Sequence, residues 1–198
     1  CDAGTLIHAE KMHVPVAGIN ADDTGRTDGI IDFSLPAATA RLIETARAKK
    51  KPLVIGTTGF SPEGKREIER ASKEIPILFS PNMSLGVNVL FKLTEIASKA
   101  LTNDYDVEIL EMHHRFKKDA PSGTANRLLE IVKDSMKDMG DAKEITGREG
   151  IVGERTKKEI GVLAMRGGDI VGEHTVFFTA MGERIELSHR AMSRDMFA

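Results

Sequence analysis

The sequence predicts an α/β protein in which a parallel-sheet domain is followed by an α+β domain with a mixed four-stranded sheet. In the first half of the chain, short apolar runs alternate with helix-like segments. This alternation is typical of parallel strands joined by right-handed crossovers. In the second half, a helix-like segment precedes three consecutive strand-like segments, the last two separated by a short turn, which favours antiparallel pairing.

The first domain is expected to contain three buried parallel strands. Apolar runs at residues 29–34, 52–56 and 75–80 predict these strands, and apolar residues at helical spacing after the first run predict a helix. A second helix is expected over residues 61–74, because Ser61 is a good N-cap and a proline follows it at the first helical position.

The second domain is expected to begin with a helix and to continue into the mixed sheet. We place the boundary in the region 85–105 and divide the chain into residues 1–84 and residues 85–198. The expected elements are a helix over 85–101, a strand over 106–114, a helix over 123–139 that ends at Gly140, and strands over 159–166, 173–180 and 183–191.

Composition excludes several classes of function. The 198 residues are 40% apolar and 29% charged, with a formal net charge of -2, so no overall basic field is available for nucleic acid. No apolar run reaches the roughly 18 residues that a membrane span needs. The single cysteine, Cys1, allows no internal disulfide and fits a reducing, cytoplasmic compartment. Small molecules and other protein subunits are therefore the expected partners.

Two loops follow predicted parallel strands, at the edge where such sheets bind ligands. The loop at residues 56–60, GTTGF, combines glycines with Thr57 and Thr58, so a flat or anionic ligand could lie on its backbone. The loop at residues 80–84, SPNMS, offers Asn82, whose amide could bind a carboxamide. Each signal is weak alone, because such turns are more often simple connections and Ser84 also suits a helix cap.

The strongest functional signal is the stretch EMHHRFKKDAPSGTAN at residues 111–126. Side chains alternate along a strand, so His113 and His114 should point to opposite sides and are a poor pair of ligands for one metal ion. Lys117 and its basic neighbours add positive charge, and the N-terminus of the following helix, at Gly123, is a natural anion site. The conjunction predicts a site for an anionic substrate and no metal.

This pocket suits the addition of electrons to a polarised, anionic substrate. A histidine can donate a proton near neutral pH, a lysine can stabilise developing negative charge, and a helix N-terminus can hold a carboxylate. If the glycine-threonine loop faces the same pocket, a nicotinamide could lie there, and hydride transfer would follow.

The sequence resembles the dihydrodipicolinate reductase (4-hydroxy-tetrahydrodipicolinate reductase) family. The resemblance rests on residues 111–125 and extends over roughly Gly29 to Ala198, through segments in the family's order: IDFS, VIGTTGF, SPNMSLGVNVL, GREGIVGER, GDIVGEHTVFF and ERIELSHRAMSR. It implies a partial Rossmann-type first domain and NADH- or NADPH-dependent reduction of 4-hydroxy-tetrahydrodipicolinate to tetrahydrodipicolinate. That reaction belongs to lysine and diaminopimelate biosynthesis.

The resemblance also implies roles for individual residues. His113 corresponds to the family's proton donor or acceptor and Lys117 to a second proton donor. His114, Gly123 and Thr124 correspond to substrate-binding positions. The positions that correspond to the nicotinamide contacts, with Arg194 as a further cofactor or hinge contact, are Gly56, Thr57, Thr58, Ser80, Pro81, Asn82, Met83 and Arg194.

The chain also departs from the family pattern. The family's N-terminal Gly-rich segment, which holds the pyrophosphate and distinguishes NADH from NADPH, has no counterpart after Cys1, and the family's last helix would follow Ala198. We therefore expect a truncated version of a longer enzyme. The resemblance implies a homotetramer formed through the mixed sheet. Two alternatives remain open: a nonredox dicarboxylate-binding module and an oligomerisation scaffold.

Overall fold

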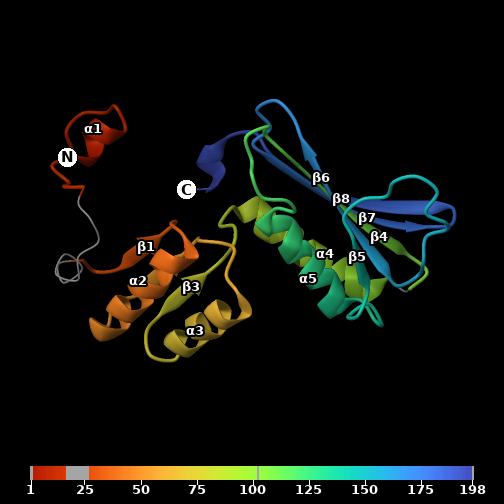
Figure 1. Ribbon diagram of the computed structural model, residues 1–198, viewed down its shortest axis with the longest axis horizontal. Coiled ribbons are helices and arrows are strands. Elements are labelled where there is room, and N and C mark those ends of the chain that lie inside the picture. The colour runs from red at the N-terminus through yellow and green to blue at the C-terminus, as the bar shows by residue number, and fades with distance from the viewer. Residues whose placement is uncertain (1, 17–26, 102, 198) are drawn as a thin grey trace. The chain divides into compact units, whose positions relative to one another are not determined.

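The computed structural model describes residues 2–16, 27–101 and 103–197, and the chain divides into two compact units. The first unit spans Cys1–Phe79 and the second spans Ser80–Ala198, as Figure 1 shows in ribbon form. The domain boundary drawn from the sequence, between residues 84 and 85, stays a prediction.

The first unit contains the predicted parallel sheet, in the order β1-β2-β3. Its strands are β1 (Ile30–Asp32), β2 (Leu53–Ile55) and β3 (Ile77–Phe79), and both neighbouring pairs are parallel. Helices α2 (Pro36–Ala48) and α3 (Pro62–Ser72) connect the strands, as the alternating pattern predicts. The apolar core of this unit consists of Ile43, Ala46, Leu53, Ile55, Ile68, Ala71 and Ile75.

Helix α3 begins as predicted. The Ser61 side chain accepts a hydrogen bond from the backbone N–H of Gly64 at 3.2 Å, and Pro62 occupies the first turn, where its missing N–H costs nothing. A short helix that the sequence did not indicate, α1 (Ala3–Leu6), starts at the N-cap Asp2, which also forms an isolated antiparallel bridge with Pro15.

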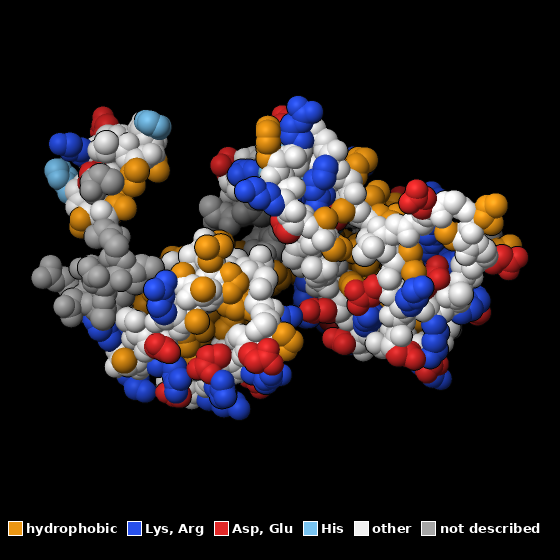
Figure 2. Space-filling view, viewed as in Figure 1, with side chains coloured by type: hydrophobic (Ala, Val, Ile, Leu, Met, Phe, Trp, Pro, Cys, Tyr) orange, Lys and Arg blue, Asp and Glu red, His pale blue; other side chains and the backbone are white. Residues whose placement is uncertain are grey.

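One face of the three-stranded sheet exposes apolar side chains. Ile31, Val54 and Leu78 are aligned across the three strands, and Ile31 and Leu78 are 74% and 56% exposed. Hydrophobic side chains also gather on the side of this unit that is visible in Figure 2.

The second unit is a mixed sheet, as predicted, but it has five strands rather than four, in the order β5-β6-β4-β7-β8. The additional strand, β5 (Lys143–Ile145), is only three residues long and two of the three are charged, so its sequence carries no strand signal. It pairs in parallel with β6 (Glu159–Arg166) at one edge. Strand β4 (Asp106–His113) is parallel to β6, and β7 (Gly172–Ala180) is antiparallel to β4 and to β8 (Glu183–Ala191).

Helices α4 (Leu85–Ala100) and α5 (Gly123–Ser135) pack on one face of this sheet around the second core, which includes Val107, Ile109 and Leu128. The predicted extension of α5 to Met139 is wrong. Met136 is extended (ψ 127°), but Met136 and Met139 are both buried in the core, so their apolar spacing continues the helical pattern beyond the last helical turn. Within the described ranges, no helix is long and apolar enough to cross a membrane.

Candidate active site

His113 lies at the carboxyl end of β4 and is fixed by a carboxylate two residues earlier on the same face of the strand. Its Nδ1 is 2.5 Å from Oε2 of Glu111, whose side chain is completely buried. Burial alone would raise the pKa of Glu111, but hydrogen bonds from His113 and Arg166 outweigh it and lower the pKa to about 2. Glu111 is therefore ionised at neutral pH.

Lys117 lies in the loop that connects β4 to α5, and its ammonium group is already paired. Its Nζ is 2.8 and 2.9 Å from the two carboxylate oxygens of Asp119. Burial would raise the pKa of Asp119, but the hydrogen bond and charge of Lys117 lower it overall. An anionic substrate must therefore compete with Asp119 for Lys117, or bind beside the pair.

The N-terminus of α5 has the open backbone N–H groups on which the sequence-based prediction of an anion site depends. Ser122 is the N-cap, and its Oγ accepts a hydrogen bond from the N–H of Ala125 at 3.2 Å. Gly123 and Thr124 occupy the first turn, where backbone N–H groups have no partner within the helix. The peptide bond before Pro121, which enters this turn, is cis.

His114 follows the last residue of β4 and has a different partner from His113. Its Nε2 is 3.2 Å from NH2 of Arg194, the first residue of the 3-10 helix η2 (Arg194–Phe197), and its ring centroid lies 6.3 Å from that of Phe116. Among the described residues, the buried Nδ1 of His114 has no hydrogen-bond partner. The roles assigned to His114 and Arg194 stay predictions, but the two side chains do meet.

A third histidine, His174 on β7, belongs to the same cluster. In the register of the sheet it lies opposite Glu111 of β4. Its Nε2 lies 3.0 Å from Oγ of Ser122, and its ring is edge-on to that of His113 with 5.2 Å between centroids. Burial, followed by the nearby charge of His113, lowers the pKa of His174 to about 3, so His174 is neutral at physiological pH.

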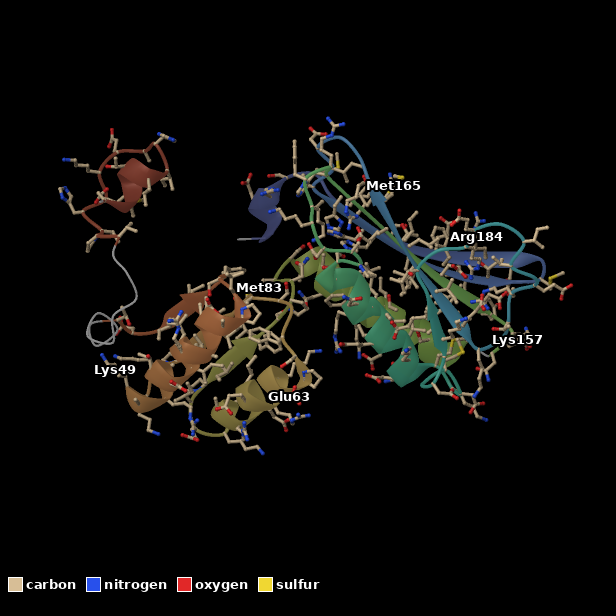
Figure 3. The ribbon with its side chains drawn as sticks, viewed as in Figure 1. Lys49, Glu63, Met83, Lys157, Met165 and Arg184 are labelled. Atoms are coloured by element: carbon tan, nitrogen blue, oxygen red, sulfur yellow. The ribbon has the colours of Figure 1, made fainter. Side chains whose placement is uncertain are left out.

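The segment Ser80–Met83, expected to contact the nicotinamide, is a hydrogen-bonded turn before α4. Oγ of Ser80 donates to the carbonyl of Asn82 at 2.6 Å, and Oδ1 of Asn82 accepts from the N–H of Ser84 at 2.9 Å. The Asn82 amide also donates to Oγ1 of Thr124 at 3.2 Å. Met83, labelled in Figure 3, is half-buried beside this turn.

The other predicted cofactor loop, Gly56–Thr58, follows β2 in the first unit. Thr57 is buried and its hydroxyl is occupied: it donates to Oδ2 of Asp32 at 3.1 Å and accepts from the N–H of Ser34 at 2.9 Å. The hydroxyl of Thr57 therefore shapes the loop, whereas the side chain of Thr58 is exposed.

The loop leaves room for one end of a nicotinamide cofactor at Gly59 and not at Gly56. A Cβ at Gly56 would lie 2.1 Å from the Phe33 ring, so the protein's own ring lies against the backbone there. Gly59 has φ +85° and open space around it, so the backbone there is accessible to a ligand. No group of three or more potential metal ligands occurs among the residues that the structure describes.

Sequence reasoning missed several residues of this site. Glu111 has no predicted role, although its position two residues before His113 puts both side chains on the same face of the strand. Asp119, in the same stretch of sequence, has no predicted role either. Arg166 and His174 come from β6 and β7, far away in the sequence, and no local pattern linked them to the histidine pair.

The fold and the site define an α/β protein with a Rossmann-type parallel sheet, followed by a mixed-sheet unit with a histidine cluster at a helix N-terminus. Comparison of the sequence with known protein families narrows this class to one family. Residues 1–83 match the family described as "Dihydrodipicolinate reductase, N-terminus" and residues 86–198 match "Dihydrodipicolinate reductase, C-terminus". The chain therefore belongs to the dihydrodipicolinate reductase family.

Individual relatives and solved structures also resemble this chain. The 4-hydroxy-tetrahydrodipicolinate reductases of Geobacter sulfurreducens and Geobacter metallireducens are each 50% identical over all of this chain and 74% of their own length. A dipicolinate-bound dihydrodipicolinate reductase from Paenisporosarcina sp. TG-14 superimposes with a TM-score of 0.69 at 26% identity, covering 94% of this chain and 71% of that one. A probable dehydrogenase from Thermotoga maritima shares the fold, with a TM-score of 0.55 at 12% identity over 87% of this chain and 61% of that one.

Proposed function

We propose that this protein catalyses the reduction of 4-hydroxy-tetrahydrodipicolinate to tetrahydrodipicolinate by NADH or NADPH, in lysine and diaminopimelate biosynthesis. The observation that carries the proposal is that a buried network joins His113 to the open N-terminus of α5 through Glu111 and Ser122. A proton donor and an anion site are therefore held together, in a chain whose relatives are named as this reductase.

One substrate carboxylate binds at the N-terminus of α5. The backbone N–H groups of Gly123 and Thr124 donate to it, and the helix dipole adds a favourable field. His114 is the further substrate-binding residue. Its contact with Arg194 keeps a permanent positive charge beside it, which suits the second carboxylate of a cyclic dicarboxylate.

The bound nicotinamide supplies a hydride to an electron-poor ring carbon conjugated to the imine of the substrate. The substrate loses its hydroxyl group as water, and overall one hydride and one proton are taken up. His113 returns a proton to the electron-rich ring, and Lys117 is the second donor once the substrate draws it away from Asp119.

The cofactor contacts belong to the two strand-end loops. In the first unit these contacts are Gly56, Thr57 and Thr58, where the Phe33 ring lies over Gly56 and the Thr57 hydroxyl is retained for the loop itself. In the second unit they are Ser80, Pro81, Asn82 and Met83, with Arg194 as the additional cofactor or hinge contact.

We further propose that the protein is a cytoplasmic homotetramer assembled through the mixed sheet. The sheet face opposite the helices carries partly exposed apolar side chains: Leu110 is aligned with Leu163 and Met112 with Met165, and Phe177 lies on the same face opposite Glu108. A Leu163→Glu variant should dissociate the assembly in sedimentation velocity, and a wild-type protein that sediments as a monomer would contradict this proposal.

The reductase proposal is tested by mixing the protein with enzymatically generated 4-hydroxy-tetrahydrodipicolinate and either NADPH or NADH. Loss of reduced-nicotinamide absorbance, with tetrahydrodipicolinate as product, is the expected result. Tight binding of pyridine-2,6-dicarboxylate without any oxidation of either cofactor would indicate a nonredox binding module instead.

A further inference from the structure

Glu111 occupies an unusual position for a carboxylate. It lies in the middle of the sheet, on a strand flanked by β6 and β7, and its side chain has no exposed surface. Removing a charge from water is costly unless strong partners replace the water. The hydrogen-bond partners of Glu111 should therefore indicate the role of this buried carboxylate.

The two oxygens of Glu111 make four hydrogen-bond contacts. Oε1 accepts from the N–H of Ser122 at 3.0 Å and from NH2 of Arg166 at 2.8 Å. Oε2 accepts from NH1 of Arg166 at 2.7 Å and contacts Nδ1 of His113 at 2.5 Å. Three of the four partners, the backbone N–H of Ser122 and the two terminal nitrogens of the Arg166 guanidinium, can only donate.

The contact with Glu111 selects the tautomer of His113. An ionised carboxylate can only accept hydrogen bonds, so Nδ1 must carry a proton and Nε2 is the nitrogen left to exchange one. Gly172 keeps that nitrogen accessible, because a Cβ at this position would lie 3.1 Å from Nε2.

The same carboxylate holds the rest of the site. Arg166 bridges from Glu111 to the backbone carbonyl of Asp119, the residue that pairs with Lys117. Through Ser122, Glu111 is also attached to the start of α5. His113 and the start of α5 thus contact Glu111 directly, and the loop that carries Lys117 is connected to it through Arg166.

We propose that Glu111 is a positioning residue for the reaction: it fixes the tautomer and orientation of His113 without touching the substrate. The inference rests on the proposed function for its catalytic meaning. Its geometric part, the tautomer, does not depend on which substrate is reduced.

A purely structural role predicts something different. On the same strand, Glu108 is also paired with arginines: its carboxylate is 2.9 and 3.2 Å from Arg148 and 3.1 Å from Arg155, and it contacts no histidine in the part of the chain that the structure describes. If Glu111 formed only another ion pair on β4, substitutions of Glu111 and of Glu108 would both lower stability. Neither substitution would then change the tautomer of His113.

The test compares the full-length wild-type protein with Glu111→Gln and, as the matched control, Glu108→Gln. Nitrogen-15 NMR of the imidazole groups identifies which nitrogen of His113 is protonated. In the wild type and in Glu108→Gln we expect protonation at Nδ1. In Glu111→Gln the amide oxygen should face Ser122 and Arg166, so its NH₂ group faces His113 and moves the proton to Nε2.

Kinetics provide the second readout. Because correct proton transfer contributes about 10²- to 10⁴-fold to a rate, Glu111→Gln should lower kcat by about 10- to 100-fold, with a smaller change in KM. Glu108→Gln should stay within about twofold of the wild type, and Glu111→Asp, which restores an acceptor-only partner, should recover part of the kcat lost in Glu111→Gln.

Three results would overturn the inference: a neutral wild-type His113 protonated at Nε2 instead of Nδ1, an unchanged neutral tautomer in Glu111→Gln, or an unchanged kcat in that variant. The wild-type tautomer can be measured even if Glu111→Gln does not fold. A wild-type protein without reductase activity would contradict the proposed function instead, and the tautomer measurement would still decide the geometric part.

Discussion

Nδ2 of Asn82 donates a hydrogen bond to Oγ1 of Thr124 at 3.2 Å. Asn82 belongs to the turn assigned to the nicotinamide, and Thr124 belongs to the helix terminus assigned to the substrate carboxylate. The bond therefore connects two parts of the proposed site that are 42 residues apart in the sequence.

Substitution of Asn82 by alanine should weaken dicarboxylate binding. Loss of one hydrogen bond of ordinary net strength, about 1 kcal/mol, predicts a roughly fivefold higher Kd for pyridine-2,6-dicarboxylate, because Thr124 is no longer held in place. Isothermal titration calorimetry provides the measurement.

The matched control is Asn88→Ala. Nδ2 of Asn88 donates to the carbonyls of Asn82 and Ser84, so this variant perturbs the same turn and leaves the bond to Thr124 in place. Equal losses of affinity in both variants would attribute the effect to the turn as a whole and contradict a specific role for the Asn82–Thr124 bond.

Asp32 should control the shape of the glycine-threonine loop. It is buried and accepts hydrogen bonds from the N–H and Oγ of Ser34, from Thr39 and from Thr57. An asparagine presents one acceptor fewer, so Asp32→Asn should cost about 1–2 kcal/mol of stability and weaken NADPH binding several-fold. Fluorescence titration with NADPH checks the second effect.

Binding of pyridine-2,6-dicarboxylate should be unaffected in Asp32→Asn, because its proposed contacts lie in the other unit. Thr45→Ala is a suitable control: its hydroxyl donates to the carbonyl of Arg41 within α2, away from the loop. If NADPH binds to Asp32→Asn as tightly as to Thr45→Ala, Asp32 has no part in shaping the cofactor loop.

His174 should make the second unit less stable in mild acid. Its folded-state pKa is about 3, against 6.5 when unperturbed, so between these values the unfolded chain binds a proton that the folded protein does not. The free energy of unfolding is therefore unaffected by His174 above pH 6.5. Between pH 6.5 and about pH 3 it falls by about 1.4 kcal/mol for each pH unit. His174→Asn should remove this part of the pH dependence.

Urea unfolding at pH 5 and pH 7 checks this expectation. Tyr105 is the only tyrosine of the chain and lies in the second unit, so its fluorescence reports that unit alone. His8→Asn, at an exposed position in the first unit, should leave the curves unchanged. The same pH dependence in wild type and His174→Asn would contradict the assignment.

The sequence predicted the elements with strong local signals. The strand predicted over 106–114, the N-cap Ser61 and the parallel pairing of the first sheet follow from periodicity and capping chemistry. Strand β5 was missed because three residues contain too little pattern, and α5 was overextended because buried methionines continue its apolar spacing.

Only the part of the candidate site that lies within one short stretch could be predicted from the sequence. His113, Lys117 and the start of α5 lie within one short stretch, so their conjunction is visible in the sequence. Arg166 and His174 reach the site only through the pairing of β4 with β6 and β7, which no local pattern specifies. The hydroxyl of Thr57 looked like a ligand group, but only the folded unit reveals that Asp32 and Ser34 occupy it.

The proposal that His113 and Lys117 are the proton donors of a dicarboxylate reductase is tested by a single comparison of rates. The rate of NAD(P)H oxidation with 4-hydroxy-tetrahydrodipicolinate is compared between the wild type and the double variant His113→Ala, Lys117→Ala, with Lys118→Ala as the control on the same loop. We predict that kcat of the double variant falls by about 10³-fold or more while cofactor binding and the rate of Lys118→Ala are retained. A double variant that turns over at the wild-type rate would contradict the account.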